Sequence, residues 1–442
     1  MPTASHRTPT ITLAKTLALL PTPSQKRIAL RVTPEAQRWI AHGHPWLFDQ
    51  AIRSQSHVGA PGDLAVIFDD RNRFLAIGLY DPASPIRVRM LQACAPAPID
   101  RRWFETRLSA ALDRREPLHR AKHTTGYRLV HGENDGLPGL VIDRYADTLV
   151  VKLYTAAWLP HLREVLGALN ELWSAERLVL RLARAVPAKS QSLGGLRDGM
   201  ILDGPPIGGA LTFLENGLRF EVDPIRGQKT GFFLDQRDNR ARLERVTRGA
   251  QVLDVFAYTG GFAVYAARGG AREITSIDAT RLALEVAARN LALNQQVRAV
   301  AKAAHRVIVG DVFDVLERLR KAQRRFDIVI LDPPAFATAH HDVKAALTAY
   351  ERLSWYGARL VRAGGILVSS SCSGHVAADR FFATVHRAAH RAGRRLTELE
   401  RTGHPLDHPV GFPEGAYLKC LFAGVEDARG LTQRASTKRS PV

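Results

Sequence analysis

Residues 252–262 read Val-Leu-Asp-Val-Phe-Ala-Tyr-Thr-Gly-Gly-Phe, and this stretch decides the fold. It predicts a short apolar strand with an acid, Asp254, near its end. Two glycines, Gly260 and Gly261, then form a turn, and an amphipathic helix follows. This order is typical of the first strand of a doubly wound α/β sheet, where a ligand cleft opens at the carboxyl ends of the strands. The stretch matches neither the P-loop pattern nor the strict dinucleotide fingerprint.

Four further strand patterns follow in order at residues 274–278, 307–311, 326–332 and 365–371. Helical patterns alternate with these strands, which predicts right-handed crossovers and a mostly parallel sheet. Each pattern ends at or just before a side chain suited to a ligand or to chemistry: Asp278, Asp311, Asp332 and Cys372. Together with Asp254, acids at four strand ends indicate a ligand with several hydroxyl and amine groups. Any one of these acids alone would more simply cap the helix that follows its strand.

The ordered set over residues 252–374 resembles the class I S-adenosylmethionine-dependent methyltransferases. The resemblance implies S-adenosylmethionine as cofactor, with Asp254 facing its amino end, Asp278 its ribose and Asp311 its adenine. Thr259, Gly260 and Gly261 are expected to give it close backbone approach, since a Cβ at either glycine would block it. The family places the segment Lys-Thr-Gly-Phe-Phe-Leu-Asp-Gln-Arg, residues 229–237, over the methionine end. The remaining predicted cofactor contacts are Gln236, Phe256, Tyr258 and Asp332.

The net positive charge of the chain indicates what kind of partner it binds. The chain has 442 residues and a net charge of +19, and 51 of its 62 basic residues are arginine. A guanidinium binds phosphate with two hydrogen bonds and stacks on bases, so this excess suggests a nucleic acid. A biased composition with a solvated basic surface would give the same count.

The three cysteines, Cys94, Cys372 and Cys420, show neither a disulfide framework nor a metal spacing. They fit a reducing compartment, so we expect a cytoplasmic protein without a metal. No apolar run approaches the roughly 20 residues of a membrane span.

The sequence divides into five segments. We expect a disordered extension at 1–25, a small β-rich domain at 26–93, an α+β central domain at 94–219, the α/β catalytic domain at 220–425, and a basic tail at 426–442. Gly-His-Pro-Trp-Leu-Phe at 43–48 and Pro-Gly-Asp at 61–63 resemble the PUA domain, an RNA-binding module. From about residue 26 to 423 the chain resembles the ribosomal RNA large-subunit cytosine-5 methyltransferases, and this resemblance implies ribosomal RNA as partner and a homodimer.

Asp332 and Cys372 end neighbouring strands, so both can face the cleft. A thiolate that adds to C6 of cytosine makes C5 able to take a methyl group, and Asp332 would bind the base edge. We expect the helix starting near Val376 to favour the thiolate. Taken alone, Cys372 would more often be a buried small hydrophobe. The family usually has Lys where this chain has Ala335, so the base that removes the C5 proton is unassigned.

Two other functions stay open at this point. An exocyclic N-methyltransferase would use the Asp-Pro-Pro loop at 332–334 to position an amine and would leave Cys372 idle. A non-catalytic RNA-binding ribosome-assembly factor would keep only the fold. Intact glycines and acids argue against the second alternative.

Overall fold

The computed structural model describes residues 12–18, 20–184, 186, 195–337 and 339–428. Within these residues the chain forms two compact units. The first unit takes residues from 1–217, 222–234 and 406–413, and the second takes residues from 218–221, 235–405 and 414–442. Among the described residues, no helix has the length and apolarity that crossing a bilayer requires.

The first unit begins with a six-stranded sheet in the order β2-β6-β5-β4-β1-β3. Its core is aliphatic and includes Ile28, Leu30, Val32 and Ile67, all fully buried. The alternating burial of β1 is typical of a strand with one face on a core. The elements are β1 (Ile28–Val32), α2 (Pro34–Ala41), β2 (Trp46–Phe48), η1 (Asp49–Ala51), β3 (Ile52–Gln55), β4 (Leu64–Phe68), β5 (Phe74–Tyr80) and β6 (Ile86–Ala93).

A second sheet of the first unit has the order β11-β10-β9-β8-β7 and mixes antiparallel pairs with the parallel pair β9–β10. Helices α3 and α5 contact each other, and their apolar residues join the core that contains Phe104 and Trp158. The elements are α3 (Arg101–Arg114), α4 (Glu116–Arg120), β7 (Gly126–His131), η2 (Gly132–Asp135), β8 (Leu140–Tyr145), β9 (Thr148–Leu153), η3 (Ala156–His161), α5 (Leu162–Leu172), β10 (Arg177–Leu182) and β11 (Ile201–Asp203). A two-stranded sheet, β12 (Leu211–Glu215) with β13 (Leu218–Val222), follows.

The amino-terminal segment is partly folded, which corrects the expectation of a disordered extension at 1–25. Helix α1 (Leu13–Ala18) lies against β11. The Leu13 backbone N–H donates to Asp203 Oδ1 at 2.9 Å, and Thr16 Oγ1 donates to the Leu202 carbonyl at 2.8 Å. Leu20 is buried in the same core. The short apolar pattern around this helix therefore packs on the first unit. Residues 1–11 and most of the expected basic tail lie outside the described residues.

The second unit is built on a seven-stranded sheet in the order β16-β15-β14-β17-β18-β20-β19. The first five strands of this order pair in parallel, and β20 pairs antiparallel with β18 and β19. The predicted doubly wound α/β class is confirmed. The strands are β14 (Gln251–Val255), β15 (Glu273–Asp278), β16 (Ala304–Val309), β17 (Phe326–Leu331), β18 (Val361–Ser371), β19 (Arg394–Thr402) and β20 (Lys419–Asp427).

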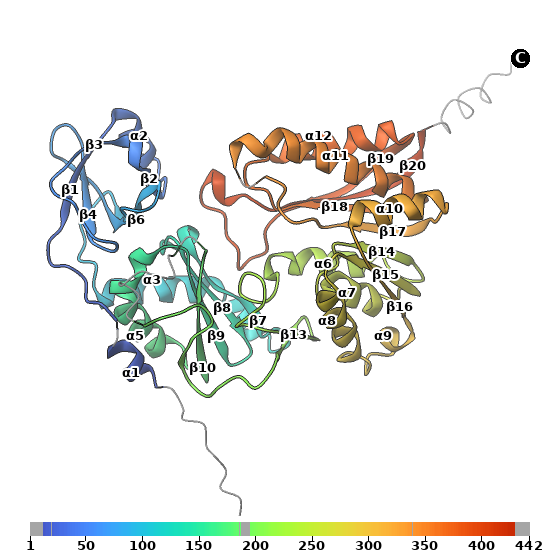
Figure 1. Cartoon of the computed structure of the whole chain (residues 1–442), viewed down its shortest axis with the longest axis horizontal. Coiled ribbons are helices and arrows are strands. Elements are labelled where there is room, and N and C mark those ends of the chain that lie inside the picture. Colours follow the sequence, from blue (N-terminus) through green and yellow to red (C-terminus); the bar gives the residue numbers. More distant parts are fainter. Residues whose placement is uncertain (1–11, 19, 185, 187–194, 338, 429–442) are drawn as a thin grey trace, which may run out of the picture. The chain divides into compact units, whose positions relative to one another are not determined.

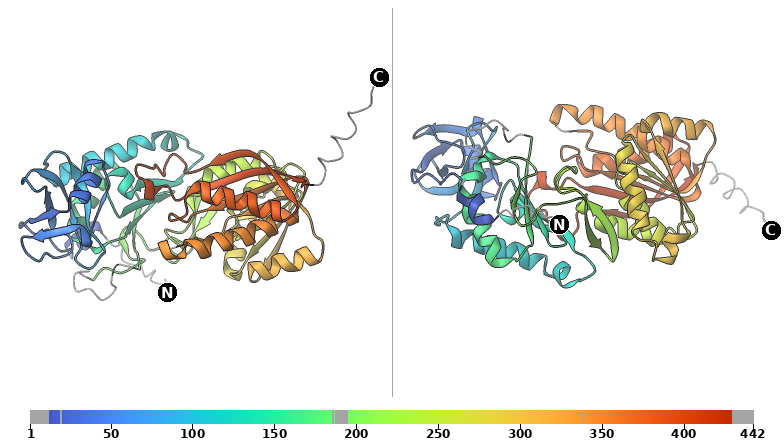
Figure 2. Two further views of the ribbon diagram at one scale, coloured as in Figure 1. Left: turned by 90° about the horizontal axis from the view of Figure 1, so that it is seen from above. Right: turned by 60° about the horizontal axis from the view of Figure 1, so that its bottom comes forward.

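Helices cover both faces of this sheet (Figures 1 and 2). Contacts join α6, α8 and α9 to α7 on one side, and α10 and α12 to α11 on the other. The buried residues of α12 include Phe381, Val385 and Ala388, whose spacing of three or four residues makes one apolar stripe. The helical elements are η5 (Leu234–Gln236), α6 (Arg237–Glu244), α7 (Gly261–Arg268), α8 (Arg281–Ala292), α9 (Arg298–Lys302), α10 (Val312–Lys321), η6 (His340–Asp342), α11 (Val343–Leu360), α12 (Ala378–Arg391) and η7 (Pro413–Gly415).

Chain order reverses at β14, which has β15 on one side and β17 on the other. In open α/β sheets the ligand cleft lies at such a reversal, beyond the carboxyl ends of the strands. The loops after β14, β15, β17 and β18 all emerge at this edge. The fold therefore brings the predicted site residues of four separated segments to one end of the sheet.

One segment departs from the predicted domain boundaries. Residues 406–413 lie in sequence between β19 and β20 but pack within the first unit. There the Asp407 carbonyl accepts a hydrogen bond from Arg115 Nη2 at 2.9 Å, and the Asp407 carboxylate accepts one from the Arg128 backbone N–H at 2.9 Å. The Gly411 N–H donates to Asn134 Oδ1 at 2.6 Å. We call residues 406–413 the strap.

Candidate active site

The loop that follows β14 has an uncommon backbone. Phe256, Tyr258 and Gly260 have φ values of +62°, +47° and +75°. Side-chain-bearing residues seldom adopt positive φ, and each such residue costs on the order of 1–3 kcal/mol. Two of them so close together indicate a loop whose shape is held by its surroundings. Strained loops of this kind cluster at ligand sites, and the sequence pattern alone did not reveal this strain.

Gly260 is required for packing as well as for its backbone angle. A Cβ at Gly260 would lie 2.7 Å from Ala287 Cβ on α8. A Cβ at Gly261 would lie 3.1 Å from Arg240 Cδ. Protein atoms therefore occupy the space beside each glycine, and the expectation that a Cβ there would also block the cofactor stays a prediction. Gly260 thus permits the close approach of α8 to this loop, and Gly261 permits that of the Arg240 side chain on α6.

Three carboxylates, those of Asp254, Asp278 and Asp332, lie near the carboxyl end of β14. Asp254 is buried, and burial together with the nearby charges of Asp332 and Asp278 raises its pKa to about 8. Its carboxylate also accepts a hydrogen bond from the Ala263 backbone N–H at the start of α7. The like charges of neighbouring carboxylates oppose ionisation of Asp254, so the cluster favours a bound cation.

The unpartnered oxygen of Asp254 tests whether the cofactor fits. Asp254 Oδ2 is buried without a hydrogen-bond partner, and such an atom costs about 1–3 kcal/mol unless a ligand satisfies it. S-adenosylmethionine carries an ammonium donor and a positive sulfonium. A cationic donor of this kind complements a buried carboxylate that has two further carboxylates nearby, so the residues present fit the cofactor.

Asp278 and Asp311 both hold backbone N–H groups. Asp278 Oδ2 accepts from the Tyr258 N–H at 3.0 Å and its Oδ1 accepts from the Thr280 N–H at 2.9 Å, so this side chain fixes the loop after β14. Asp311 lies beyond the end of β16 and caps α10 through Oδ1, which accepts from the N–H groups of Phe313 and Asp314. The capping interpretation is therefore correct for Asp311, and its cofactor role stays a prediction.

Gln236 is connected directly to Asp332. Gln236 Nε2 donates to Asp332 Oδ1 at 2.7 Å, and Asn239 Nδ2 donates to Gln236 Oε1 at 2.6 Å. Both amide side chains are buried. This chain of hydrogen bonds fixes the Asp332 carboxylate at the end of β17. Thr259 is held similarly, since its carbonyl accepts from Asn290 Nδ2 at 2.8 Å.

Cys372 lies one residue beyond β18, at the same sheet edge as Asp332. Strands β17 and β18 are parallel with Leu331 opposite Ser369, so their carboxyl ends lie side by side. Cys372 is partly exposed, and its Sγ lies 3.8 Å from the Pro333 carbonyl oxygen. The thiol is therefore not packed as a core hydrophobe. Cys420, in contrast, is fully buried within β20.

The helix that we expected near Val376 begins at Ala378, with Ala377 as its N-cap. A helix dipole acts mainly within its first turn. Cys372 precedes that turn, so the dipole of α12 contributes less to its ionisation than the sequence suggested.

Two functional candidates near Cys372 were missed by reasoning from the sequence. Tyr350 on α11 shares hydrogen bonds with Ser371 Oγ at 2.9 Å and Ser373 Oγ at 2.8 Å, and burial raises the pKa of its phenol. Lys419 on β20 donates from Nζ to the Ser373 carbonyl at 2.6 Å. Lys419 comes close because β20 pairs with β18, and Tyr350 comes close because α11 packs against β18.

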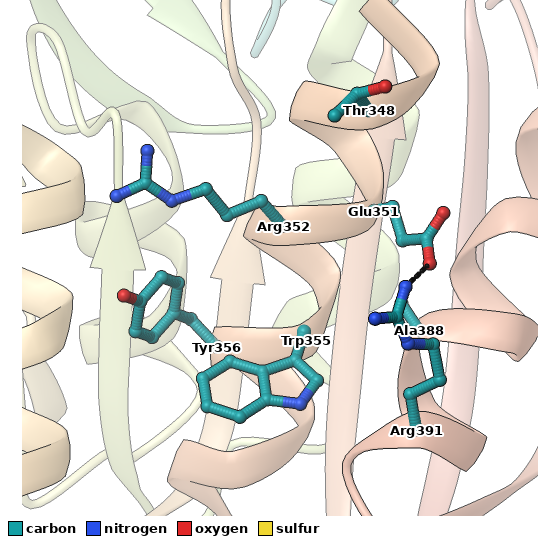
Figure 3. A pocket seen from close by; sticks show the side chains of 7 residues that line it. All are labelled: Thr348, Glu351, Arg352, Trp355, Tyr356, Ala388 and Arg391. Carbon is teal, nitrogen blue, oxygen red and sulfur yellow. Dashed lines mark hydrogen bonds and ion pairs between the residues drawn. The ribbon is translucent and has the colours of Figure 1, made fainter.

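A separate hollow of about 460 Å³ lies on α11 and α12 (Figure 3). None of the predicted site residues lines it. Glu351 forms ion pairs there with Arg387 at 3.0 Å and with Arg391 at 2.6 Å. Its lining residues are Thr348, Glu351, Arg352, Trp355, Tyr356, Ala388 and Arg391. Because the strained loop, the carboxylates and the thiol lie at the strand-end edge, we place the chemistry there. Among the described residues, no group of three or more His, Cys, Asp or Glu is arranged to hold a metal ion.

The fold and the carboxylate cleft define an S-adenosylmethionine-dependent methyltransferase. A family model with that description matches residues 134–423, and a PUA-like domain model matches residues 30–93. The chain belongs to the family of S-adenosylmethionine-dependent ribosomal RNA large-subunit methyltransferases, as the following relatives show.

A protein of Deinococcus radiodurans named ribosomal RNA large subunit methyltransferase is 47% identical over 410 residues, which is 91% of this chain and 98% of that protein. Ribosomal RNA large subunit methyltransferase I of Shewanella amazonensis is 36% identical, over 90% of this chain and 99% of its own. A methyltransferase crystal structure described as SMU.776 complexed with SAH has the same fold. Its TM-score is 0.76 at 23% identity, and the match covers 90% of this chain and 99% of that one.

Proposed function

We propose that this enzyme methylates C5 of a cytidine in large-subunit ribosomal RNA, and that the Cys372 thiolate forms a covalent adduct at C6 of the base. One observation carries the proposal: a partly exposed thiol and a fixed carboxylate lie at adjacent carboxyl ends of β17 and β18, at the edge where the carboxylate cleft opens. The names of the relatives support the RNA substrate, and so does the net charge of +19.

The chemistry assigns a role to each group. Cys372 Sγ forms a bond to C6, which gives C5 the electron density of an enamine. Asp332, held by Gln236, binds the N3 and N4 edge of cytosine and stabilises charge that develops there. The cofactor supplies an electrophilic methyl group on its sulfonium. Loss of the C5 proton to a base then expels the thiolate and restores the aromatic ring. No residue is assigned as this base, and Ala335 cannot serve as one.

The cofactor contacts are a second part of the proposal. We propose that Asp254 meets the amino end of S-adenosylmethionine and that Asp278 binds its ribose. The loop of Phe256, Tyr258, Thr259, Gly260 and Gly261 would lie against it, with Gln236 and Asp332 at the methionine end and Asp311 at the adenine. The strained backbone of this loop and the unpartnered Asp254 oxygen support the assignment.

Covalent trapping tests the proposal. In RNA that contains 5-fluorocytidine, fluorine replaces the C5 proton. A base cannot remove fluorine, so the thiolate is not expelled and the adduct should persist. Mass spectrometry should locate this adduct on Cys372. Cys372→Ser should abolish both adduct and methylation while S-adenosylmethionine still binds. The matched control Cys94→Ser removes an exposed thiol and should retain full activity. Methylation that survives in Cys372→Ser would instead support an exocyclic N-methyltransferase.

A further inference from the structure

Lys419 is a buried cation beside the proposed nucleophile. It is the first residue of β20, it pairs with Ser371 across the antiparallel β18–β20 ladder, and its exposed fraction is 3%. Its ammonium donates to the carbonyl of Ser373, the residue that follows Cys372. A buried ammonium is unfavourable unless a negative charge compensates it. In the part of the chain that the structure describes, no carboxylate lies within ion-pair distance of Lys419.

We infer that Lys419 holds Cys372 in the thiolate form, and thereby acts on the reaction as a positioning residue through the cysteine. The inference depends on the proposed function only for the role of that thiolate as the nucleophile. A hydrogen bond holds the ammonium at the carbonyl of Ser373, the residue that adjoins Cys372. The thiolate in turn supplies the negative charge that a buried ammonium requires, and the thiol proton passes to solvent.

Electrostatics on the lysine agree with this geometry. Burial lowers the pKa of Lys419 to about 8, while the charge of Cys372 acts in the opposite direction and raises it. Interaction between two groups is mutual, so an ammonium that is stabilised by the thiolate stabilises the thiolate equally. A neighbouring lysine is one of the recognised causes of a low cysteine pKa in proteins.

Other groups around Cys372 do not replace this cation. Asp332, one residue beyond β17, is an acid and supplies no positive charge. Tyr350 on α11 is neutral, with burial raising its pKa. His375 lies exposed in the turn after Cys372, and the carbonyl oxygen of Glu414 approaches that turn at Gly374. The late start of α12 also removes the helix dipole as the main source of positive potential.

Alkylation of Cys372 tests the inference without any substrate. The full-length, cofactor-free protein is treated with iodoacetamide between pH 5 and 10, and mass spectrometry reads the Cys372 peptide alone. The rate of alkylation should rise with pH as the thiol ionises, and the midpoint of that rise gives the pKa of Cys372. We expect this midpoint at least one unit below the ordinary thiol value of about 8.5. Lys419→Met should raise the midpoint by about one unit or more. Lys419→Arg should restore it, and Lys344→Met, which removes an exposed lysine of α11, should not change it.

Several results would overturn the inference. A wild-type midpoint at or above the ordinary value refutes it even if Lys419→Met does not fold, and so does an unchanged midpoint in a folded Lys419→Met protein. The adduct with 5-fluorocytidine separates the two proposals. If the wild type forms the adduct and Lys419→Met leaves the midpoint of Cys372 alkylation unchanged, only the role of Lys419 is refuted. If Lys419→Met shifts the midpoint but the wild type forms no adduct, the ion pair between Lys419 and Cys372 is supported and the proposed methylation of C5 is refuted.

Discussion

Replacing Asp254 by Asn should abolish a proton release that accompanies cofactor binding. In the free protein, burial and the charges of Asp332 and Asp278 raise the pKa of Asp254 to about 8, so the carboxyl is mostly protonated at neutral pH. An ammonium donor that binds its unpartnered Oδ2 favours the ionised form. Binding of S-adenosylmethionine must then expel the proton, whereas Asn carries no proton to lose.

The size of the effect follows from the pKa. At pH 7 a group with a pKa of about 8 is roughly nine-tenths protonated, so binding should release about 0.9 protons. Cofactor affinity should weaken about tenfold between pH 7 and pH 6, or about 1.4 kcal/mol, because each unit below the pKa adds a tenfold cost of deprotonation. Near pH 9 the carboxyl of the free protein is already ionised, and the release should fall to about 0.1 protons.

Isothermal titration calorimetry in buffers of different ionisation enthalpy measures this release. The difference between the wild type and Asp254→Asn separates Asp254 from the titrating groups of the cofactor itself. Asp379→Asn is a suitable control, since it removes an exposed carboxylate in the first turn of α12 that has no proposed contact with the cofactor, and it should keep the release of the wild type. Equal proton release by the wild type and Asp254→Asn at pH 7 would refute the reasoning, because the buried carboxyl would then not be the group that binding ionises.

Three further perturbations have outcomes set by the structure. Gly260→Ala should lower the free energy of unfolding by about 2 kcal/mol or more, because it combines a positive φ with a Cβ contact of 2.7 Å to Ala287; chemical denaturation measures this, and a neutral result would show that α8 yields easily. Asp135→Ala should cost about 3–5 kcal/mol since it removes the carboxylate that Arg115 binds in a buried pair. The exposed pair of Asp70 with Arg53 provides a control, and Asp70→Ala should cost less than about 1 kcal/mol. RNA affinity should fall with a log–log salt slope of about −4, which corresponds to five or six neutralised phosphates on single-stranded RNA; a flat profile in a filter-binding assay would contradict the role of the arginines.

The catalytic fold could be predicted from the sequence because its strands are central and parallel. Strands such as β17 are buried on both faces, so they appear as continuous apolar runs between helical patterns. Their order is then limited by the right-handed crossover rule. Asp254, Asp278, Asp332 and Cys372 could be placed at one edge for the same reason, since parallel strands share a carboxyl end.

Features that depend on packing between distant segments could not be predicted in this way. Lys419 reaches Cys372 only because β20 inserts beside β18, and the sequence does not state which strand lies on that side. The strained φ values of Phe256 and Tyr258 follow from the surroundings of the loop rather than from residue type. Helix α1 was missed because six residues carry too little periodicity to outweigh a polar, proline-containing context.

The strap makes the order of synthesis matter for this enzyme. Its Asp407 and Gly411 bind Arg115, Arg128 and Asn134, which the ribosome produces some 270 residues or more before them. Strand β20 of the catalytic sheet follows the strap in sequence. That sheet is therefore complete only after the chain has passed through a segment that packs within the first unit. A gene fragment that starts at Leu218 would encode every strand of that sheet and yet leave the Asp407 carboxylate without its Arg128 partner. Dissecting this protein into separately expressed halves therefore calls for replacing residues 406–413 by a short polar linker rather than for a single cut.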